Sequence, residues 1–578
     1  MDFRRAIAEL IAVRTGMDAG ILVDSVEVPP QPELGDYAFP CFPLARTLHK
    51  SPPVIAAELA ATLAEGAPFL ARVQAVGGYL NFFLDRGVFV ATVVADALQA
   101  GSRLGATDEG AGKTVIVEFS SPNIAKPFHI GHAFTTILGH SLYKLYAHLG
   151  YHVVRMNHLG DYGTQFGKLI VAYEKWGDEP ALLAAPIKEL LRIYVKFHDE
   201  AKKDPALDIE ARARFLRLEE GGSAEMALWK RFRDLSLLEF ARVYDRMGIA
   251  FDNYNGESFY SDRIPAVVDM LKAKGLLVES EGAQVVHLEE EGFPPCIVLK
   301  SDGATIYASR DIASVLYRKE TYDFFKNIYV VGTPQALHFR QVFAVLKKAG
   351  FDFADDCVHV GFGLVKFADR KLSTREGEVI FLDELLAESI AKTREIIDRN
   401  ADLRGTDMGE AERAEIAEKV GIGAVQYAFV KNGRDRDIVF SWEEMLDFEG
   451  ESAPYAMYTY ARGRSVLRKA AAEGSADGSG ATAEDLARMT GDDEVAVAKL
   501  LYGFGEAVHK AVESNEPFMM TRQVAGIARA FNKFYNNESI LSAPDAGLRR
   551  ARIALTEAVC VALRTGLDLV GISAVERM

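Results

Sequence analysis

The stretch VIVEFSSPNIAKPFHIGH, residues 115–132, is the part of the sequence from which the fold can be worked out. Thr114–Val117 is β-branched and apolar, which is typical of a strand buried on both faces, and turn-forming residues follow it. Pro127 suits the first turn of a helix, because it lacks the N–H that would be unsatisfied there. A strand that feeds a helix N-terminus presents free N–H groups and a positive dipole end to an anion. The stretch therefore predicts a phosphate site.

Two histidines close this stretch. His129 and His132 lie three residues apart and project from one face of the predicted helix, and Gly131 between them leaves room for a base or a ribose. Two ordinary surface or core histidines remain an alternative. A zinc site is another, but neither an HExxH pattern nor a CxxC pair accompanies the histidines. The pattern is compatible with ATP binding.

The composition is that of an ordinary globular protein. A chain of 578 residues is too long for a single hydrophobic core, and its length predicts about three or four domains. The four cysteines lie far apart, which favours a reducing compartment, and we expect a cytoplasmic protein with no membrane segment. The net charge of −16 does not decide about a nucleic-acid partner, since residues 451–578 hold 15 Lys and Arg against 16 Asp and Glu.

The order of apolar patterns predicts a multidomain chain, α/β plus all-α. Residues 1–108 form a small α+β domain, with a strand at Val26–Pro30 and a turn at Gly35–Ala38. Residues 109–390 form a doubly wound parallel, Rossmann-type catalytic sheet, in which Cys296–Leu299 is expected as a strand. The remaining parts are a helical insertion at about residues 168–252, a helical connection at 391–450 and a C-terminal helical bundle at 451–578.

The quoted stretch and other segments resemble a known family. His129–His132 is similar to the HIGH motif of class I aminoacyl-tRNA synthetases, and Glu118–His129 resembles the form found in arginyl-tRNA synthetases. Residues 157–167, NHLGDYGTQFG, resemble a second signature of arginyl-tRNA synthetases, with Tyr162 where Trp is usual. Gly35–Pro40 resembles the family's N-terminal domain, which contacts the corner of the tRNA. The resemblance spans essentially the whole chain and implies an arginine–tRNA ligase that needs tRNA for activation of the amino acid.

The resemblance also implies the substrate-binding residues. A guanidinium is planar and always charged, so its site needs carboxylates and side-chain oxygens. Asp311 would pair with the guanidinium and Tyr307 would lie one turn earlier, while Glu118 and Asn123 would hold the α-amino end. Taken alone, Asp311 could equally be a helix N-cap. The arginine-binding candidates are Glu118, Asn123, Tyr307, Asp311 and Gln335, and the ATP-binding candidates are His129, Gly131, His132, His338 and Lys371.

The segment Lys371–Gly377 occupies the place of the class I KMSKS loop, which puts cations on the phosphates. Thr374 stands where most class I enzymes have the second lysine, and Lys126 or Arg375 is the candidate substitute. Without the resemblance, such a loop is a solvated turn. The implied catalytic residues are His129, His132, Lys126, Lys371 and Arg375, with the histidines and Lys126 neutralising the phosphates.

An aromatic and basic segment near residue 460 resembles the start of the family's anticodon-binding bundle. Tyrosines can stack on bases and arginines can contact phosphates, so Tyr455, Tyr458, Tyr460 and Arg462 are candidates for tRNA binding. A buried tyrosine stripe is the alternative. The implied partners are tRNA(Arg), L-arginine and ATP with Mg²⁺, without a tightly bound cofactor or a protein-held metal, and a monomer is the default. The competing functions are a catalytically silent tRNA-binding relative and another HxGH nucleotidyltransferase.

Overall fold

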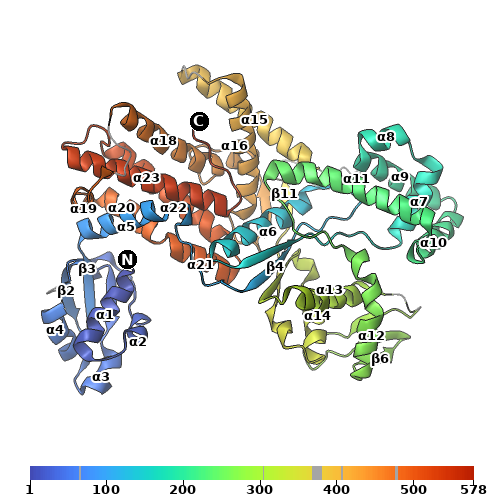
Figure 1. The fold of residues 1–578 in the computed structure, drawn as a ribbon, viewed down its shortest axis with the longest axis horizontal. Coiled ribbons are helices and arrows are strands. Elements are labelled where there is room, and N and C mark those ends of the chain that lie inside the picture. The colour runs from blue at the N-terminus through green and yellow to red at the C-terminus, as the bar shows by residue number, and fades with distance from the viewer. Residues whose placement is uncertain (64–66, 302, 304, 368–380, 405–407, 475–479) are drawn as a thin grey trace.

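The computed structural model describes residues 1–63, 67–301, 303, 305–367, 381–404, 408–474 and 480–578. It confirms the predicted fold class: a parallel sheet with helices on both faces, a helical insertion, a small α+β domain and a helical bundle (Figure 1). The N-terminal domain lies beside the bundle, and the helical insertion lies at the opposite end of the molecule. The catalytic sheet lies between them.

The N-terminal domain is a three-stranded antiparallel sheet in the order β1-β3-β2, covered by short helices. The predicted turn at Gly35–Ala38 is wrong, because Tyr37 begins β1, whose buried residues pair with β3. The predicted strand at Val26–Pro30 is reduced to one bridge between Glu27 and Ala38, since the two prolines cannot donate to a ladder. The elements are α1 (Phe3–Thr15), α2 (Ala19–Val23), η1 (Pro32–Leu34), β1 (Tyr37–Pro40), α3 (Phe42–Leu48), α4 (Pro52–Leu63), β2 (Leu70–Val76) and β3 (Tyr79–Leu84).

The catalytic sheet has four parallel strands in the order β10-β9-β4-β5. Val115 and Val117 of β4 join the hydrophobic core on the side of α6 and the C-terminal bundle, whereas Ile116 joins the core formed by α12, α13 and α14. Helices thus cover both faces, as a parallel sheet requires. The elements are β4 (Thr114–Glu118), α6 (Ile130–His148), β5 (His152–Met156), η3 (Glu257–Arg263), α12 (Ile264–Ala273), α13 (Tyr307–Tyr322), β9 (Lys326–Val330), η4 (Thr333–Gln335), α14 (Ala336–Lys348), η5 (Asp352–Asp356) and β10 (Cys357–Val360).

The prediction that Cys296–Leu299 belongs to the catalytic sheet is wrong. This segment is β8, which pairs antiparallel with β7 (Ala283–Val286), and β6 (Leu277–Ser280) completes a separate sheet. A short apolar run has the same pattern in a parallel and in an antiparallel strand, so its own sequence could not tell them apart. The tight turn Glu281-Gly282, with φ of 50° and 81°, joins β6 to β7 as a two-residue hairpin.

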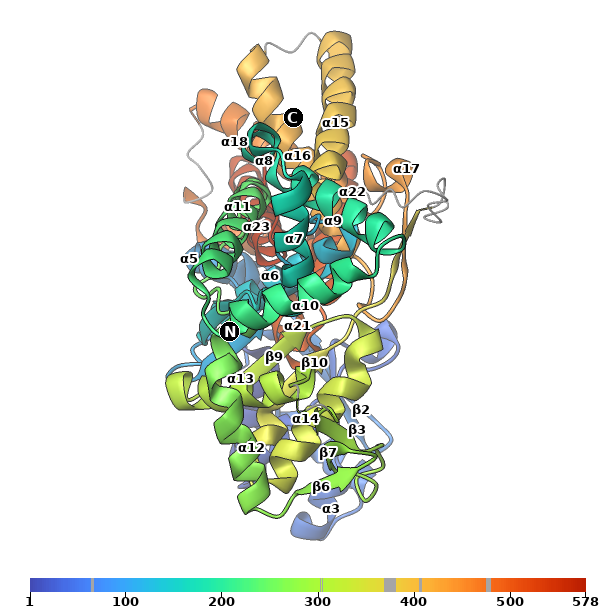
Figure 2. The same cartoon turned by 90° about the vertical axis from the view of Figure 1, so that its right-hand side faces the viewer.

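The helical insertion has a hydrophobic core of its own and projects from the sheet (Figure 1), and Figure 2 shows it from its outer end, in front of the helical bundle. Its last helix, α11, has 25 residues and runs back from this core to the catalytic sheet. The insertion therefore buries its own apolar faces and also supplies one long helix to the centre of the molecule. Its helices are α7 (Gln165–Trp176), α8 (Glu179–Ala184), α9 (Pro186–Ala201), α10 (Ala206–Glu219) and α11 (Ser223–Met247).

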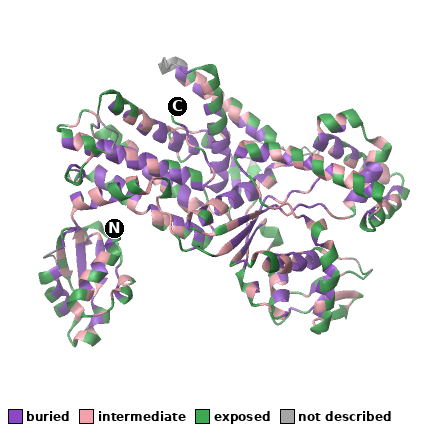
Figure 3. Cartoon of the chain, viewed as in Figure 1, coloured by how far each residue is buried: buried purple, intermediate pink, exposed green. Residues whose placement is uncertain are grey.

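The C-terminal bundle packs against the catalytic domain through buried helix faces (Figure 3). The hydroxyl of Ser141 on α6 donates to the carbonyl of Val570 at 3.2 Å, and α5 (Arg86–Ala100) packs on the bundle with η2 (Gly101–Arg103). No helix in the described part of the chain is long and apolar enough to cross a membrane. The remaining elements are β11 (Val365–Phe367), α15 (Leu382–Arg404), α16 (Glu410–Val430), β12 (Ile438–Phe440), α17 (Trp442–Met445), α18 (Ala453–Ala472), α19 (Ala483–Leu486), α20 (Asp492–Tyr502), α21 (Phe504–Ser514), α22 (Phe518–Asn537) and α23 (Ala546–Leu569).

Candidate active site

The loop that follows β4 has a strained backbone. Ser120 and Ser121 adopt left-handed conformations, with φ of 70° and 44°, which cost about 1–3 kcal/mol each in residues other than glycine. The Ser120 hydroxyl lies 2.7 Å from the hydroxyl of Tyr244, and the Ala125 N–H donates to the hydroxyl of Ser236 at 2.9 Å. Tyr244 and Ser236 both belong to α11. The helical insertion therefore holds this loop in its conformation.

The helix α6 begins at Ile130, so the prediction that Pro127 lies in its first turn is wrong. His129 is the N-cap, and its Nδ1 accepts a hydrogen bond from the Gly131 N–H at 3.0 Å. The Nδ1 of His132 accepts from the His129 N–H at 3.3 Å. The two rings lie 4.0 Å apart between centroids, as the predicted common face requires. Pro127 lies before this cap because the histidine side chain, and not the proline ring, closes the helix end.

The surroundings of both histidines favour the neutral ring. Burial, assisted by Lys126, lowers the pKa of His129, and burial with His129 and Lys126 lowers the pKa of His132 to about 3. Since Nδ1 accepts a hydrogen bond in each ring, the proton of the neutral ring sits on Nε2. The neutral rings can therefore donate N–H groups to a phosphate, and the expectation that the histidines neutralise the phosphates stays a prediction.

The second signature segment, residues 157–167, follows β5 and is hydrogen-bonded to the loop that follows β4. The Gly160 N–H donates to the Pro122 carbonyl at 3.1 Å, and the Ile124 N–H donates to the Gly160 carbonyl at 3.2 Å. A Cβ at Gly160 would lie 2.2 Å from Oδ1 of Asn123. Only glycine permits this approach. The amide of Asn123 is thus positioned by the backbone of the signature segment.

Two of the arginine-binding candidates share α13. Asp311 lies one turn after Tyr307, and its carboxylate is hydrogen-bonded to Nε2 of His338 on α14. Asp311 is the fifth residue of its helix, so the N-cap alternative is wrong. Tyr307 is 62% exposed, and Gln335 is exposed at the end of η4, just beyond β9. The structure thus brings an arginine-binding candidate, Asp311, against an ATP-binding candidate, His338.

Glu118 ends β4, where ligand crevices of parallel sheets lie. Its carboxylate is buried and forms an ion pair with Arg318 of α13, which the sequence did not predict. A second unpredicted pair joins Glu257 of η3 to Arg310 of α13, at 3.5 Å between Oε2 and Nε. Burial raises the pKa of Glu257 to about 7, although Arg310 acts in the opposite direction. One signal in the sequence could have indicated these two ion pairs: Arg310 and Arg318 lie on the apolar face of the amphipathic helix α13, where a buried charge needs a partner.

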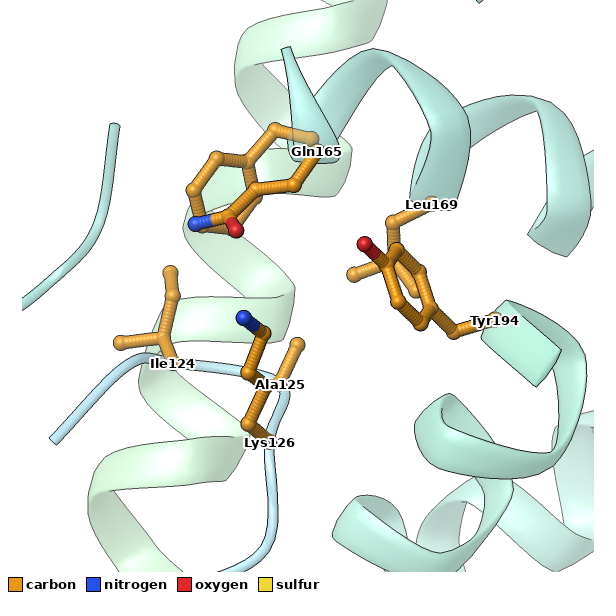
Figure 4. A pocket seen from close by; sticks show the side chains of 7 residues that line it. Ile124, Ala125, Lys126, Gln165, Leu169 and Tyr194 are labelled. Atoms are coloured by element: carbon orange, nitrogen blue, oxygen red, sulfur yellow. The ribbon is translucent and has the colours of Figure 1, made fainter. Parts of the chain in front are cut away.

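Lys126 extends from the same loop. It lines a small pocket together with residues of α7 and α9, and Figure 4 shows its side chain beside that of Gln165, with Tyr194 across the pocket. Lys371 and Arg375 lie outside the described residues. The chain is described again at Phe381, which forms a bridge with His129, and the Leu382 N–H donates to the Phe128 carbonyl at 2.9 Å. Phe381 and Leu382, which follow the KMSKS-like segment Lys371–Gly377 in the sequence, therefore lie beside His129 and Phe128.

The four tRNA-binding candidates lie in the first half of α18, and their side chains differ in exposure. Tyr460 is buried, and its hydroxyl donates to Glu576 at 2.6 Å, so the alternative of a buried tyrosine holds for this residue. Tyr455 and Tyr458 are half-buried. The Arg462 guanidinium lies 5.0 Å from the ring centroid of Tyr458. Tyr455, Tyr458 and Arg462 therefore form a partly exposed aromatic and cationic group on α18.

A doubly wound sheet whose first strand leads into a histidine-capped helix, followed by a helical C-terminal domain, defines the class as class I aminoacyl-tRNA synthetases. Residues 93–442 match the family model of the class I (R) tRNA synthetase catalytic domain. Residues 2–84 match the arginyl tRNA synthetase N terminal domain, and residues 456–578 match the DALR anticodon binding domain. The chain belongs to the arginyl-tRNA synthetase family.

Individual relatives agree with the family models. The chain is 51% identical over 580 residues to the arginine–tRNA ligase of Clostridium beijerinckii and 52% identical over 579 residues to that of Clostridium botulinum, in each case covering 100% of both chains. The arginyl-tRNA synthetase of Thermus thermophilus has a similar structure, with a TM-score of 0.80, 26% identity and 100% of both chains covered. That of Plasmodium falciparum shares the fold, with a TM-score of 0.75 and 21% identity over 96% of this chain and 94% of its own.

Proposed function

We propose that this chain is an arginine–tRNA ligase, which activates L-arginine with ATP and transfers it to tRNA(Arg). The observation that carries the proposal is the contact between Asp311 and His338 near the carboxyl edge of the sheet. It combines a carboxylate suited to a guanidinium with a side chain proposed for the nucleotide, in a chain of the arginyl-tRNA synthetase family. The two substrates can then lie next to each other.

The reaction proceeds by two displacements. A carboxylate oxygen of arginine attacks the α-phosphorus of ATP, the bond to the pyrophosphate oxygen breaks, and pyrophosphate leaves. A hydroxyl of the terminal ribose of the tRNA then attacks the carbonyl carbon of the adenylate, and AMP leaves. No protein nucleophile is needed, since catalysis by positioning and by stabilisation of developing charge is sufficient.

The histidine-capped helix binds the phosphates in this proposal. The Nε2–H groups of His129 and His132 act as neutral donors, and the Lys126 ammonium supplies positive charge. Gly131 is proposed to leave space for the nucleotide, and it also lets the His129 ring cap the helix, because a Cβ there would lie 2.8 Å from Cε1 of His129. Lys371 and Arg375 are proposed as further cations, although both lie outside the described residues.

Selectivity for arginine follows from the charge of the pocket. Asp311, with Tyr307 and Gln335, receives the guanidinium, and Glu118 and Asn123 receive the α-amino end. An uncharged analogue such as citrulline would leave a carboxylate without its cationic partner, and polar mismatches of this kind can discriminate by roughly 10⁴-fold. We therefore propose no editing step.

The remaining partners follow from the same function. Mg²⁺ prefers phosphate oxygens and water and would arrive with ATP. We propose that it has no protein ligand. Tyr455, Tyr458 and Arg462 are proposed to contact tRNA. A monomer in the cytoplasm, and the division of the chain at residues 108, 390 and 450, remain part of the proposal.

The test is ATP–pyrophosphate exchange with each amino acid, with and without tRNA(Arg), followed by aminoacylation of the tRNA. We expect exchange with arginine in the presence of tRNA, and charging of tRNA(Arg). Tight tRNA binding without any exchange would instead identify a silent relative. Exchange with a different amino acid would overturn only the choice of substrate.

A further inference from the structure

Arg318 is the most deeply buried charged side chain near the candidate active site. It belongs to α13, and 0% of its side chain is exposed. Its guanidinium forms an ion pair with Glu118 and lies 5.1 Å from the ring centroid of Tyr329 on β9. Within the described part of the chain, Glu118 is the only carboxylate that forms an ion pair with Arg318. The substrate cannot reach this guanidinium, so any effect on the reaction has to pass through Glu118.

Glu118 lies between Arg318 and the carboxyl edge of the sheet. Its Oε2 accepts the hydrogen bond from Nη2 of Arg318, while the side chain retains 6% exposure. A free glutamate can rotate about three side-chain torsions, and fixing them costs conformational entropy. A charged hydrogen bond to one oxygen fixes the orientation of the other oxygen as well, because the carboxylate is planar.

The position of Arg318 on its helix adds a second constraint. Tyr307, Asp311 and Arg318 follow one another at intervals of four and seven residues, which places them on one face of α13. Asp311 lies near the start of this face and Arg318 lies two turns later, about 10 Å along the axis. The same rigid helix thus carries the carboxylate proposed for the guanidinium and the cation that holds Glu118.

The charge of Arg318 is maintained in spite of its burial. Burial lowers the pKa of the guanidinium, but Glu118, Tyr329 and Tyr260 raise it, and the pKa lies well above its ordinary value. The Glu118 carboxylate therefore faces a permanent positive charge. Arg318 occupies one carboxylate oxygen, and the other oxygen can accept a hydrogen bond from the α-ammonium group of an amino acid.

We propose that Arg318 is a positioning residue, which fixes the Glu118 carboxylate so that its second oxygen binds the α-ammonium group of arginine. This inference rests on the proposed function. Together with Asp311, it makes α13 the element that sets the separation between the two ends of the substrate. Arg318 then determines affinity for the α-amino group without touching the substrate.

The test compares Arg318→Met, Arg318→Lys and a matched control in ATP–pyrophosphate exchange with tRNA(Arg) present. The control is Arg552→Met, which removes the arginine of another buried ion pair, with Glu494 in the bundle. We expect Arg318→Met to raise KM for arginine roughly 10- to 100-fold, as loss of a charged hydrogen bond does, and KM for ATP to change less than about threefold. Arg318→Lys keeps the charge and should recover part of the loss. Unchanged KM for arginine in Arg318→Met would overturn the positioning role.

A substrate analogue separates positioning from general damage. The inhibitor 5-guanidinopentanoate is arginine without its α-ammonium group, so its inhibition constant should change less than about threefold in Arg318→Met. An equal loss of affinity for arginine and for this analogue would show that Arg318 has only a structural role, and would overturn the proposal. The Arg552→Met control should leave both constants unchanged.

A double variant keeps the test valid if Arg318→Met does not fold. Glu118→Gln combined with Arg318→Met removes both buried charges, which is less damaging than leaving one unpaired. Because Arg318 acts through Glu118, KM for arginine in the double variant should lie within about threefold of that in Glu118→Gln alone. A further tenfold loss would overturn the proposal. If the unmodified chain shows no arginine-dependent exchange, the proposed function fails together with this inference, whereas normal exchange with additive losses overturns the inference alone.

Discussion

Substitution of Gly160 by alanine should misplace Asn123 and weaken the use of arginine. The new Cβ would lie 2.2 Å from Oδ1 of Asn123 and 2.9 Å from its Cγ, whereas an ordinary contact begins near 3.4 Å. The amide therefore has to move by about 1.2 Å, the difference between the two distances. The backbone of Gly160 does not have a positive φ, so alanine can adopt its conformation without strain. The collision is therefore the obstacle. The severe contacts are with Oδ1 and Cγ of the side chain, which can move without unfolding the loop, and the Asn123 Cα at 3.3 Å has to shift only slightly.

The expected effect of this displacement falls on one substrate. A misplacement of about 1 Å at a positioning residue can cost roughly 100-fold in rate, equivalent to about 2.7 kcal/mol. We expect kcat/KM for arginine in the exchange reaction to fall by about this factor, while KM for ATP changes less than about threefold. Gly409→Ala is the control, because a Cβ there meets no atom within 4 Å. Equal losses for arginine and ATP, or no loss at all, would refute the assignment of Asn123 to the amino acid.

Three further substitutions test other parts of the molecule. Lys126→Ala should lower kcat for exchange roughly 100-fold, as removal of a charge-stabilising donor does, and unchanged turnover would transfer the role of the missing lysine to Arg375. Glu257→Gln should stabilise the chain above pH 7. A carboxyl with its pKa raised from 4.5 to about 7 holds a proton that the unfolded chain releases, so the free energy of unfolding falls as the pH rises through this range, by about 3 kcal/mol in total. Thermal unfolding of both proteins at pH 5 and pH 8 measures this, and an equal change in stability between the two pH values would contradict it. Arg462→Ala should weaken tRNA binding and reduce the slope of log Kd against log salt by about 0.7–0.9, if the arginine contacts one phosphate; an unchanged slope would place the contact elsewhere.

The sequence predicted the parts of the fold that local patterns determine. The strand that ends at Glu118 and the helix over residues 133–148 were recognisable because a buried strand and an amphipathic helix each repeat with their own period. The alternation of strands and helices along the chain was sufficient to predict the doubly wound sheet. The sheet to which Cys296–Leu299 belongs was not predictable in this way, since its partner strands lie in a hairpin whose turn, Glu281-Gly282, has only a weak turn signal.

The candidate site was predictable as a set of residues but not as a set of contacts. The positions of Asp311 and His338 were available from the resemblance, whereas their contact depends on how α13 and α14 pack. The pairing of Glu118 with Arg318 joins residues 200 positions apart, and no local pattern specifies it. The neutral state of His132 likewise follows from burial, which a sequence does not show.

The strained serines show why local sequence and local conformation diverge most at the site itself. Ser120 and Ser121 are turn formers, so the sequence correctly predicts that the strand ends, but two consecutive left-handed serines are unfavourable in isolation. The hydroxyl of Tyr244, 124 positions away, accepts or donates the hydrogen bond that retains Ser120 in this conformation, and Asn157 donates to the same hydroxyl at 3.1 Å. Each of these hydrogen bonds contributes about 1 kcal/mol, which is comparable with the strain of one serine. Thr135 and Thr136 of α6 also bind Ser120, at 3.1 Å and 2.8 Å. The conformation of this loop therefore depends on packing against α6, α11 and the segment after β5 together, and the helical insertion is one of the elements that support the candidate site.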